Sequence, residues 1–240
     1  MKKIVKLFAV AAMLLMGGQA MAQARAVMFL SAAFPTSDYA EFDDDGFALA
    51  SDDDDAAASL GFNAGIKWYF NMGVPGLGVM LSVDGFYNGL NDGAKDFYKN
   101  RQTALDVLGN NVTMTTPKYF NVPVMLGLNY MYHINSNLGM YIEAGAGGNA
   151  RFITNYAESY KDLLGEKHSA TVNYETALGF AYQVGAGFEV SKNLVIGCSF
   201  YNLGKAEVKA EKTGDIFTTP VPNGSFIKPT MVMVRIGFNF

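Results

Sequence analysis

The sequence predicts an all-β fold, an eight-stranded antiparallel up-and-down transmembrane β-barrel. Three observations lead to this prediction. Eight stretches alternate apolar residues with small or polar ones, which is the period of a strand with two different faces. The links between these stretches are alternately long and short. Only 17% of the 240 residues are charged, whereas soluble domains usually carry about 25%.

The composition excludes several other classes of protein. Half of the residues are apolar, but after the N-terminal segment no apolar run reaches the roughly 18 residues that a transmembrane helix needs. The net charge is −4, and without a basic patch we expect no nucleic-acid partner. Cys198 is the single cysteine, so the chain can form neither an internal disulfide nor a cysteine-based zinc cluster. We expect no cofactor.

The first 22 residues have the pattern of a secretory signal peptide. Three lysines precede an apolar run from Leu7 to Met16, and the small-x-small sequence Ala20-Met21-Ala22 follows. This run is too short to cross a bilayer, and its flanks are those of a cleaved export signal. We therefore expect residues 1–22 to be removed and the mature barrel to comprise 23–240.

The strands and their connections follow in order along the mature chain. The alternating stretches are 24–34, 58–70, 77–88, 118–132, 138–150, 173–190, 194–208 and 227–240. The long polar links are 35–57, 89–117, 151–172 and 209–226, and the short ones are 71–76, 133–137 and 191–193. This alternation is typical of outer-membrane barrels, which have tight periplasmic turns and long extracellular loops. It predicts a Gram-negative type of outer membrane as the location, with both termini on the periplasmic side.

The two faces of each stretch differ in the way that a narrow barrel requires. In the last strand, Val232, Val234 and Ile236 alternate with Met233 and Arg235. One face is continuous hydrocarbon for about ten residues, roughly what a tilted strand needs to cross a bilayer. The other face mixes glycine with polar groups, as expected for a lumen that side chains just fill.

Two local features of the strands leave structural questions open. Aromatic residues near the short turns fit either an interfacial girdle or the ordinary strand propensity of aromatics; they are Trp68, Tyr69, Phe70, Tyr130, Tyr132, Phe238 and Phe240. Pro123 lies inside the fourth stretch and cannot donate a ladder hydrogen bond, so it predicts a bulge or a kink.

Three short segments resemble the porin-like small outer-membrane β-barrel family. They are Tyr119-Phe120-Asn121-Val122-Pro123-Val124, Tyr201-Asn202-Leu203-Gly204 and the C-terminal run Val232 to Phe240. The resemblance implies that Phe238 and Phe240 belong to a signal read by the barrel-assembly machinery. This family is functionally broad, so the resemblance implies little chemistry.

Five charged residues fall on the predicted inner face: Lys67, Asp84, Glu143, Glu189 and Arg235. A buried charge without a partner is too costly to keep. We therefore predict that Lys67 and Arg235 pair with Glu143, Glu189 or both and plug the periplasmic half of the lumen. The alternative is an ion or proton path. A plug also predicts interlocking bulky side chains, namely Met80, Met125, Met231, Met233 and Tyr141.

The long links contain three further candidate features. In the acidic first link, Glu41, Asp43, Asp45 and Asp52 partly resemble a calcium loop. They predict either a solvated loop or weak binding of divalent cations, which could bridge to lipopolysaccharide. The second link suggests a short helix within 92–108 that caps the barrel mouth. His168 and Ser169 are adjacent in the third link, but the sequence supplies no third group to orient them for catalysis.

Together these features predict a non-enzymatic integral outer-membrane barrel with a structural or surface-interaction role. The alternative is a narrow porin-like channel for small or apolar solutes. We expect a monomer whose partners are outer-membrane lipid and lipopolysaccharide. A soluble ligand-binding barrel fits less well, because the outer face is apolar and the chain ends in Phe240.

Overall fold

The computed structural model describes residues 24–41, 56–216 and 226–240 of the chain. The predicted signal peptide, 1–22, lies outside these residues, so its removal stays a prediction. The elements are β1 (Ala24–Pro35), η2 (Ser37–Tyr39), β2 (Ala58–Asn71), β3 (Leu77–Leu90), α2 (Asp92–Leu108), β4 (Asn110–Thr115), β5 (Tyr119–His133), β6 (Leu138–Ile153), β7 (Tyr156–Lys161), β8 (Lys167–Tyr174), β9 (Ala177–Val190), β10 (Leu194–Asn202), β11 (Ala206–Glu207), β12 (Ala210–Gly214), β13 (Phe226–Ile227) and β14 (Thr230–Asn239).

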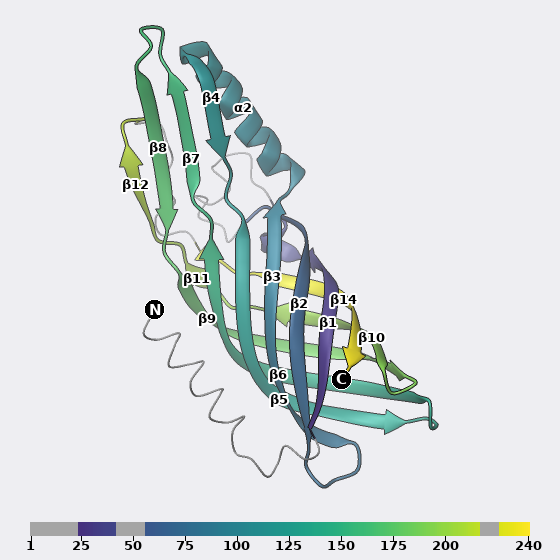
Figure 1. Cartoon of the computed structure of the whole chain (residues 1–240). Helices are drawn as coiled ribbons and strands as arrows, with labels where there is room; N and C mark the ends of the chain where they lie inside the picture. Colours follow the sequence, from purple (N-terminus) through teal and green to yellow (C-terminus); the bar gives the residue numbers. More distant parts are fainter. Residues whose placement is uncertain (1–23, 42–55, 217–225) are drawn as a thin grey trace.

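Eight of these strands close into an antiparallel barrel, which confirms the predicted fold class. Their order around the barrel is β1-β14-β10-β9-β6-β5-β3-β2, as Figure 1 shows. The first and last strands pair over nine positions, from Val27 opposite Asn239 to Pro35 opposite Met231. Closure leaves no free sheet edge, which is the condition that a bilayer imposes on β-structure.

The outer surface of the barrel is apolar on every side. Large apolar side chains alternate outward along the strands, among them Leu30, Phe62, Leu126, Ile142, Phe180, Ile196 and Ile236. Phe180 is 66% exposed and Leu60 is 60% exposed. An apolar surface of this extent is unfavourable in water but favourable in hydrocarbon. The barrel exterior is therefore the lipid-facing surface.

The long connections build a second body, which we call the extension. It consists of a four-stranded sheet in the order β12-β8-β7-β4 with α2 beside it, and it rises beyond the long-link end of the barrel (Figure 1). The antiparallel pairs β4–β7, β7–β8 and β8–β12 hold the sheet together. Two segments that the sequence predicts as polar loops, 89–117 and 151–172, thus contain a helix and strands.

The helix α2 has the bounds at which the sequence suggests a helix. Its first turn is capped by Asn91, whose side-chain oxygen accepts a hydrogen bond from the backbone N–H of Ala94 at 3.0 Å. The helix buries Ala94, Tyr98 and Leu105. It stands along the extension instead of lying across the barrel mouth (Figure 1). Among the described residues, no helix is long and apolar enough to cross a membrane.

Three of the predicted stretches extend beyond the barrel strand that they contain. The stretch 173–190 divides at residues 175–176 into the end of β8 and the whole of β9. The stretch 194–208 gives β10 only as far as Asn202, and β14 begins at Thr230. In each case the residues beyond the break belong to β8, β11 or β13, which pair outside the barrel.

Pro123 produces no bulge, which was one of the two irregularities predicted for it. The β3–β5 ladder keeps one register on both sides of it, with Val83 opposite Val124 and Phe86 opposite Asn121. Between these pairs the ladder is interrupted, because proline has no N–H to donate. On its other side Pro123 pairs regularly with Asn149 of β6. A register shift lies elsewhere, between Ala58 and Gly61 in the β2–β3 ladder.

Candidate functional site

Three charged side chains meet in the lumen and form what we call the ionic layer: Lys67 of β2, Glu143 of β6 and Arg235 of β14. Lys67 Nζ and Arg235 Nη2 both donate to Glu143 Oε1, each at 2.5 Å. All three side chains are at most 1% exposed. A carboxylate shared between two cations in this way satisfies charges that would be costly to bury alone.

Neutral side chains add further contacts to the ionic layer, although Nε and Nη1 of Arg235 have no hydrogen-bond partner among the described residues. The Tyr69 hydroxyl donates to the other Glu143 oxygen, Oε2, at 2.9 Å. Lys67 Nζ also donates to Gln183 Oε1 at 2.9 Å. The Arg235 guanidinium lies 4.8 Å from the centre of the Phe29 ring, within the range of a cation–π contact. Polar and aromatic partners therefore hold the layer in one arrangement.

Asp84 faces the same part of the lumen but contacts neutral partners. It is 2% exposed, and its oxygens accept hydrogen bonds from Asn63 Nδ2 at 3.4 Å and from the Tyr201 hydroxyl at 3.3 Å. The Tyr201 ring centre in turn lies 5.7 Å from Lys67 Nζ. With two cations and two carboxylates, the formal charges of Asp84 and the ionic layer sum to zero.

Glu189, the fifth predicted lumen residue, pairs with Arg25 of β1 and not with the ionic layer. The β6–β9 register explains this, because Gly185 is the residue opposite Glu143 and Glu189 lies four positions closer to the short turn. Four strand residues span roughly 13 Å. Glu189 is therefore out of reach of Lys67 and Arg235. Arg25 has the same inward phase as Val27, a signal that the sequence contains and the prediction missed.

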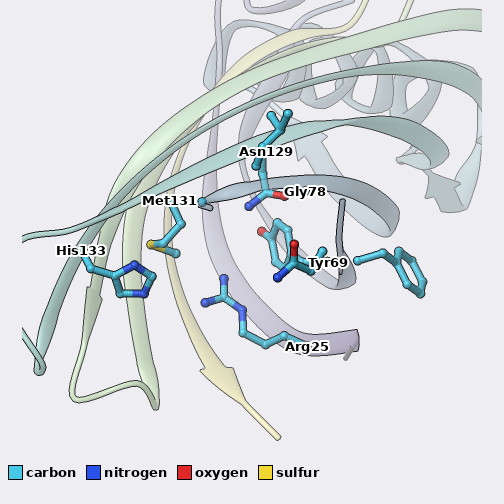
Figure 2. Close-up of a pocket in the computed structure, with 10 residues that line it drawn as sticks. Arg25, Tyr69, Gly78, Asn129, Met131 and His133 are labelled. Carbon is cyan, nitrogen blue, oxygen red and sulfur yellow. The ribbon is translucent and has the colours of Figure 1, made fainter. Parts of the chain in front are cut away.

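A pocket of about 190 Å³ opens at the short-turn end, beside Arg25. Figure 2 shows Arg25, Tyr69, Asn129 and His133 around it. Because Tyr69 also donates to Glu143, the ionic layer begins where the pocket ends. Within the described residues, the buried Asn129 Oδ1 has no hydrogen-bond partner. The pocket is a vestibule of the barrel.

A second buried arginine, Arg151, lies toward the long-link end. It donates to the Ile227 carbonyl oxygen at 2.7 Å and to the Gly204 carbonyl oxygen at 2.8 Å. Its Nε donates to Asn121 Oδ1 at 3.3 Å. The sequence prediction ended this strand at residue 150, so it placed Arg151 in a loop. Its spacing of eight from Glu143 gives the same inward phase.

The remaining predicted residues are placed as follows. The bulky lumen residues are all buried at 2% exposure or less, namely Met80, Met125, Tyr141, Met231 and Met233. Phe238 and Phe240 are exposed, and their recognition by an assembly machinery stays a prediction.

In the acidic loop, Glu41 is exposed at the end of the first described segment. Asp43, Asp45 and Asp52 lie outside the described residues, so the suggested cation loop stays untested.

His168 lies in the extension, in a hydrogen-bonded frame that the sequence did not reveal. Its Nδ1 is 2.6 Å from Asp215 Oδ2, and its Nε2 is 3.6 Å from Asp162 Oδ2. The hydrogen bond to Asp215 raises the pKa of His168 above its ordinary value. Ser169 follows His168 on β8 and therefore points to the opposite face of the sheet. The adjacent histidine and serine do not form a catalytic couple.

No protein-family model and no curated protein sequence matches the chain. Similar solved structures include Ail, the attachment invasion locus protein of Yersinia pestis, which is 16% identical with 90% of this chain and 97% of that chain covered and a TM-score of 0.41. A major outer membrane protein from Thermus thermophilus is 13% identical, with coverages of 91% and 100% and a TM-score of 0.42. The outer membrane protein AlkL is 14% identical, with coverages of 91% and 90% and a TM-score of 0.41. All three TM-scores are below 0.5.

The barrel itself decides the class of the protein. Its eight antiparallel strands close without an edge, its exterior is apolar, and its lumen holds the buried charges. The chain is an outer-membrane type of transmembrane β-barrel. Its long connections lie at one end and its short turns at the other, as in other barrels of this type.

Proposed function

We propose that this barrel has a surface-interaction role, that it does not conduct, and that it acts through the extension outside the cell. Long connections face the exterior in outer-membrane barrels. On this basis the extension faces outward and the vestibule beside Arg25 opens to the periplasm.

The observation that carries the proposal is the folded state of the extension. Its four strands form a sheet, and α2 is attached to that sheet by Arg101. The guanidinium of Arg101 makes two 2.7 Å hydrogen bonds to the two carboxylate oxygens of Glu158 in β7. A bidentate pair of this kind fixes the position of the helix. A rigid platform suits recognition of a partner, because little ordering entropy is lost on binding.

The filled lumen supports the absence of conduction. Side chains with at most 2% exposure occupy it from Phe29 and Met80 to Tyr201 and Met231, and the ionic layer ties three strands together across it. An eight-stranded barrel is only wide enough for side chains to fill its interior. A conducting lumen would require Glu143 to separate from Lys67 and Arg235, which would leave three charged side chains unpaired and buried.

The geometry around His168 supports a non-enzymatic role. Ser169 lies on the face of β8 opposite to His168, and its backbone N–H, not its hydroxyl, donates to Asp215 at 2.8 Å. A hydroxyl nucleophile needs a base within hydrogen-bond reach. We therefore propose no hydrolase or transferase activity at this position.

Single-channel recording tests the closed lumen. We expect refolded protein in planar lipid bilayers to give no stable conductance steps, with heat-modifiability on gels showing that the barrel is folded. Stable steps from folded protein would overturn the closed lumen and favour the porin-like alternative.

Cysteine labelling on intact cells tests the orientation of the extension. In a Cys198→Ser background, Leu163→Cys places one thiol at an 87% exposed position of the extension, and Met72→Cys places one at a 51% exposed position of a short turn. A membrane-impermeant maleimide should label Leu163→Cys on intact cells. Met72→Cys, the matched control, should react only after the outer membrane is permeabilised. The reverse pattern would refute an outward-facing extension.

We propose that the protein is a monomer in a Gram-negative type of outer membrane, where lipid and lipopolysaccharide surround it. We also propose that residues 1–22 direct its export and are then cleaved off. Phe238 and Phe240 point outward at the end of the chain, 55% and 74% exposed, which supports recognition by the barrel-assembly machinery. Their replacement by alanine should reduce the folded fraction in cells and leave refolding of the purified protein in detergent unchanged.

A further inference from the structure

One face of the β7–β8 hairpin tip carries side chains of types that can bind a metal ion. Tyr160 pairs with His168, and Lys161 pairs with Lys167. Because side chains alternate along strands, His168 shares a face with Tyr160 and the two lysines point to the other face. The positive charges nearest to His168 in the hairpin are therefore directed away from it.

The turn between the two strands brings two carboxylates to the same place. Asp162 Oδ1 accepts the backbone N–H groups of Leu164 and Glu166 at 2.9 Å and 2.8 Å. These bonds hold the turn and leave Asp162 Oδ2 facing His168 Nε2 at 3.6 Å. One ligand atom from each of Asp162, Glu166 and His168 lies within 4.8 Å of the others.

Asp215, which directly follows β12, orients the histidine. Its Oδ2 lies 2.6 Å from His168 Nδ1, and its Oδ1 accepts the backbone N–H of Ser169 at 2.8 Å. In the neutral tautomer whose Nδ1–H donates to this carboxylate, Nε2 carries the lone pair and faces Asp162. Metal-binding histidines characteristically donate their second ring nitrogen to a carboxylate, which fixes the tautomer and the ring orientation.

We propose that Asp162, Glu166 and His168 form a binding site for a divalent metal ion of the Zn²⁺ type, with Asp215 as the residue that positions His168. Bond lengths of about 2.0–2.1 Å place two tetrahedral ligands roughly 3.3 Å apart, close to the 3.6 Å between Asp162 Oδ2 and His168 Nε2. Glu166 is exposed, so rotation of its side chain can close the remaining distance. Water would complete the coordination.

The ligand set distinguishes between classes of metal ion. An imidazole nitrogen with two carboxylates suits Zn²⁺ and its Co²⁺ substitute. Ca²⁺ and Mg²⁺ prefer sites made only of oxygen atoms.

Zn²⁺ titration of the refolded full chain without a polyhistidine tag tests the proposal, by calorimetry in detergent micelles and by Co²⁺ absorption. We expect one Zn²⁺ per chain that excess Ca²⁺ does not displace. His168→Ala should abolish this binding, while His133→Ala, which removes the only other histidine, should leave it unchanged. Asp215→Asn should weaken it by about 10–100-fold, because it keeps all three ligands and changes only the positioning of His168.

Two further variants separate coordination from the structure of the turn. Asp162→Asn keeps an oxygen that can accept the two backbone hydrogen bonds but removes the charge, and Glu166→Gln removes only a charge. Each should weaken Zn²⁺ binding at least tenfold, with heat-modifiability unchanged. The proposal would be overturned by no binding at millimolar Zn²⁺, by equal losses in His133→Ala and His168→Ala, or by displacement of the ion by Ca²⁺. None of these outcomes depends on whether the barrel conducts.

Discussion

Glu143→Gln is the most direct test of the energetics of the ionic layer. The substitution keeps the size of the side chain but removes the only carboxylate hydrogen-bonded to Lys67 and Arg235 among the described residues. Both cations are at most 1% exposed. Breaking one buried pair by removing a partner costs about 3–5 kcal/mol. Since Glu143 serves two cations, we expect the free energy of unfolding to fall by about 5 kcal/mol.

The assay is urea unfolding of the barrel in lipid vesicles, followed by the fluorescence of Trp68, the single tryptophan. Glu189→Gln is the matched control. Its partner Arg25 has a side chain that is 30% exposed, so water can solvate the unpaired charge and the loss should be about 1 kcal/mol. A Glu143→Gln protein within 1 kcal/mol of wild type, or a larger loss for Glu189→Gln, would refute the argument.

Two further predictions concern the extension. Arg101→Met should leave the buried carboxylate of Glu158 without its bidentate partner and destabilise the extension locally by about 3 kcal/mol; hydrogen exchange should speed up in β7 while the barrel strands stay protected, and the exposed pair variant Lys95→Met should exchange like wild type. The raised pKa of His168 means that its contact with Asp215 stabilises fully below pH 6.5 and loses this contribution as the pH rises through the folded-state pKa. An NMR titration should give a midpoint above 6.5 that falls in Asp215→Asn; an unchanged midpoint would contradict the assignment.

The barrel could be predicted from the sequence because lipid and lumen impose opposite requirements on successive residues. In β14, Val234 and Ile236 face lipid while Met233 and Arg235 are buried, and this contrast is visible as period 2. The pairing of Lys67 and Arg235 with a carboxylate could be predicted because a buried charge without a partner is too costly to keep. The sequence could not show that this carboxylate is Glu143 and not Glu189, since the answer depends on the β6–β9 register.

The extension could not be predicted in the same way. Its strands have no lipid-facing side, and the alternation that they do show is short: in β8 only Ala170 and Val172 are buried between polar neighbours. Glu158 appears as an ordinary surface residue, yet it is 2% exposed because Arg101 approaches from α2, more than 50 positions away in the chain. The contact of Asp215 with His168 likewise depends on the pairing of β12 with β8.

The pairing of β1 with β14 has a consequence for how the chain can be cut and joined. The backbone N–H of Phe240 donates to the Ala26 carbonyl oxygen at 3.1 Å, so both ends of the barrel sequence lie at one seam. A closed ring of strands has no intrinsic first member. A circular permutant with a short linker here and new termini in the extension should therefore refold in detergent, and its behaviour in cells would show whether the order of the strands along the chain matters for biogenesis alone.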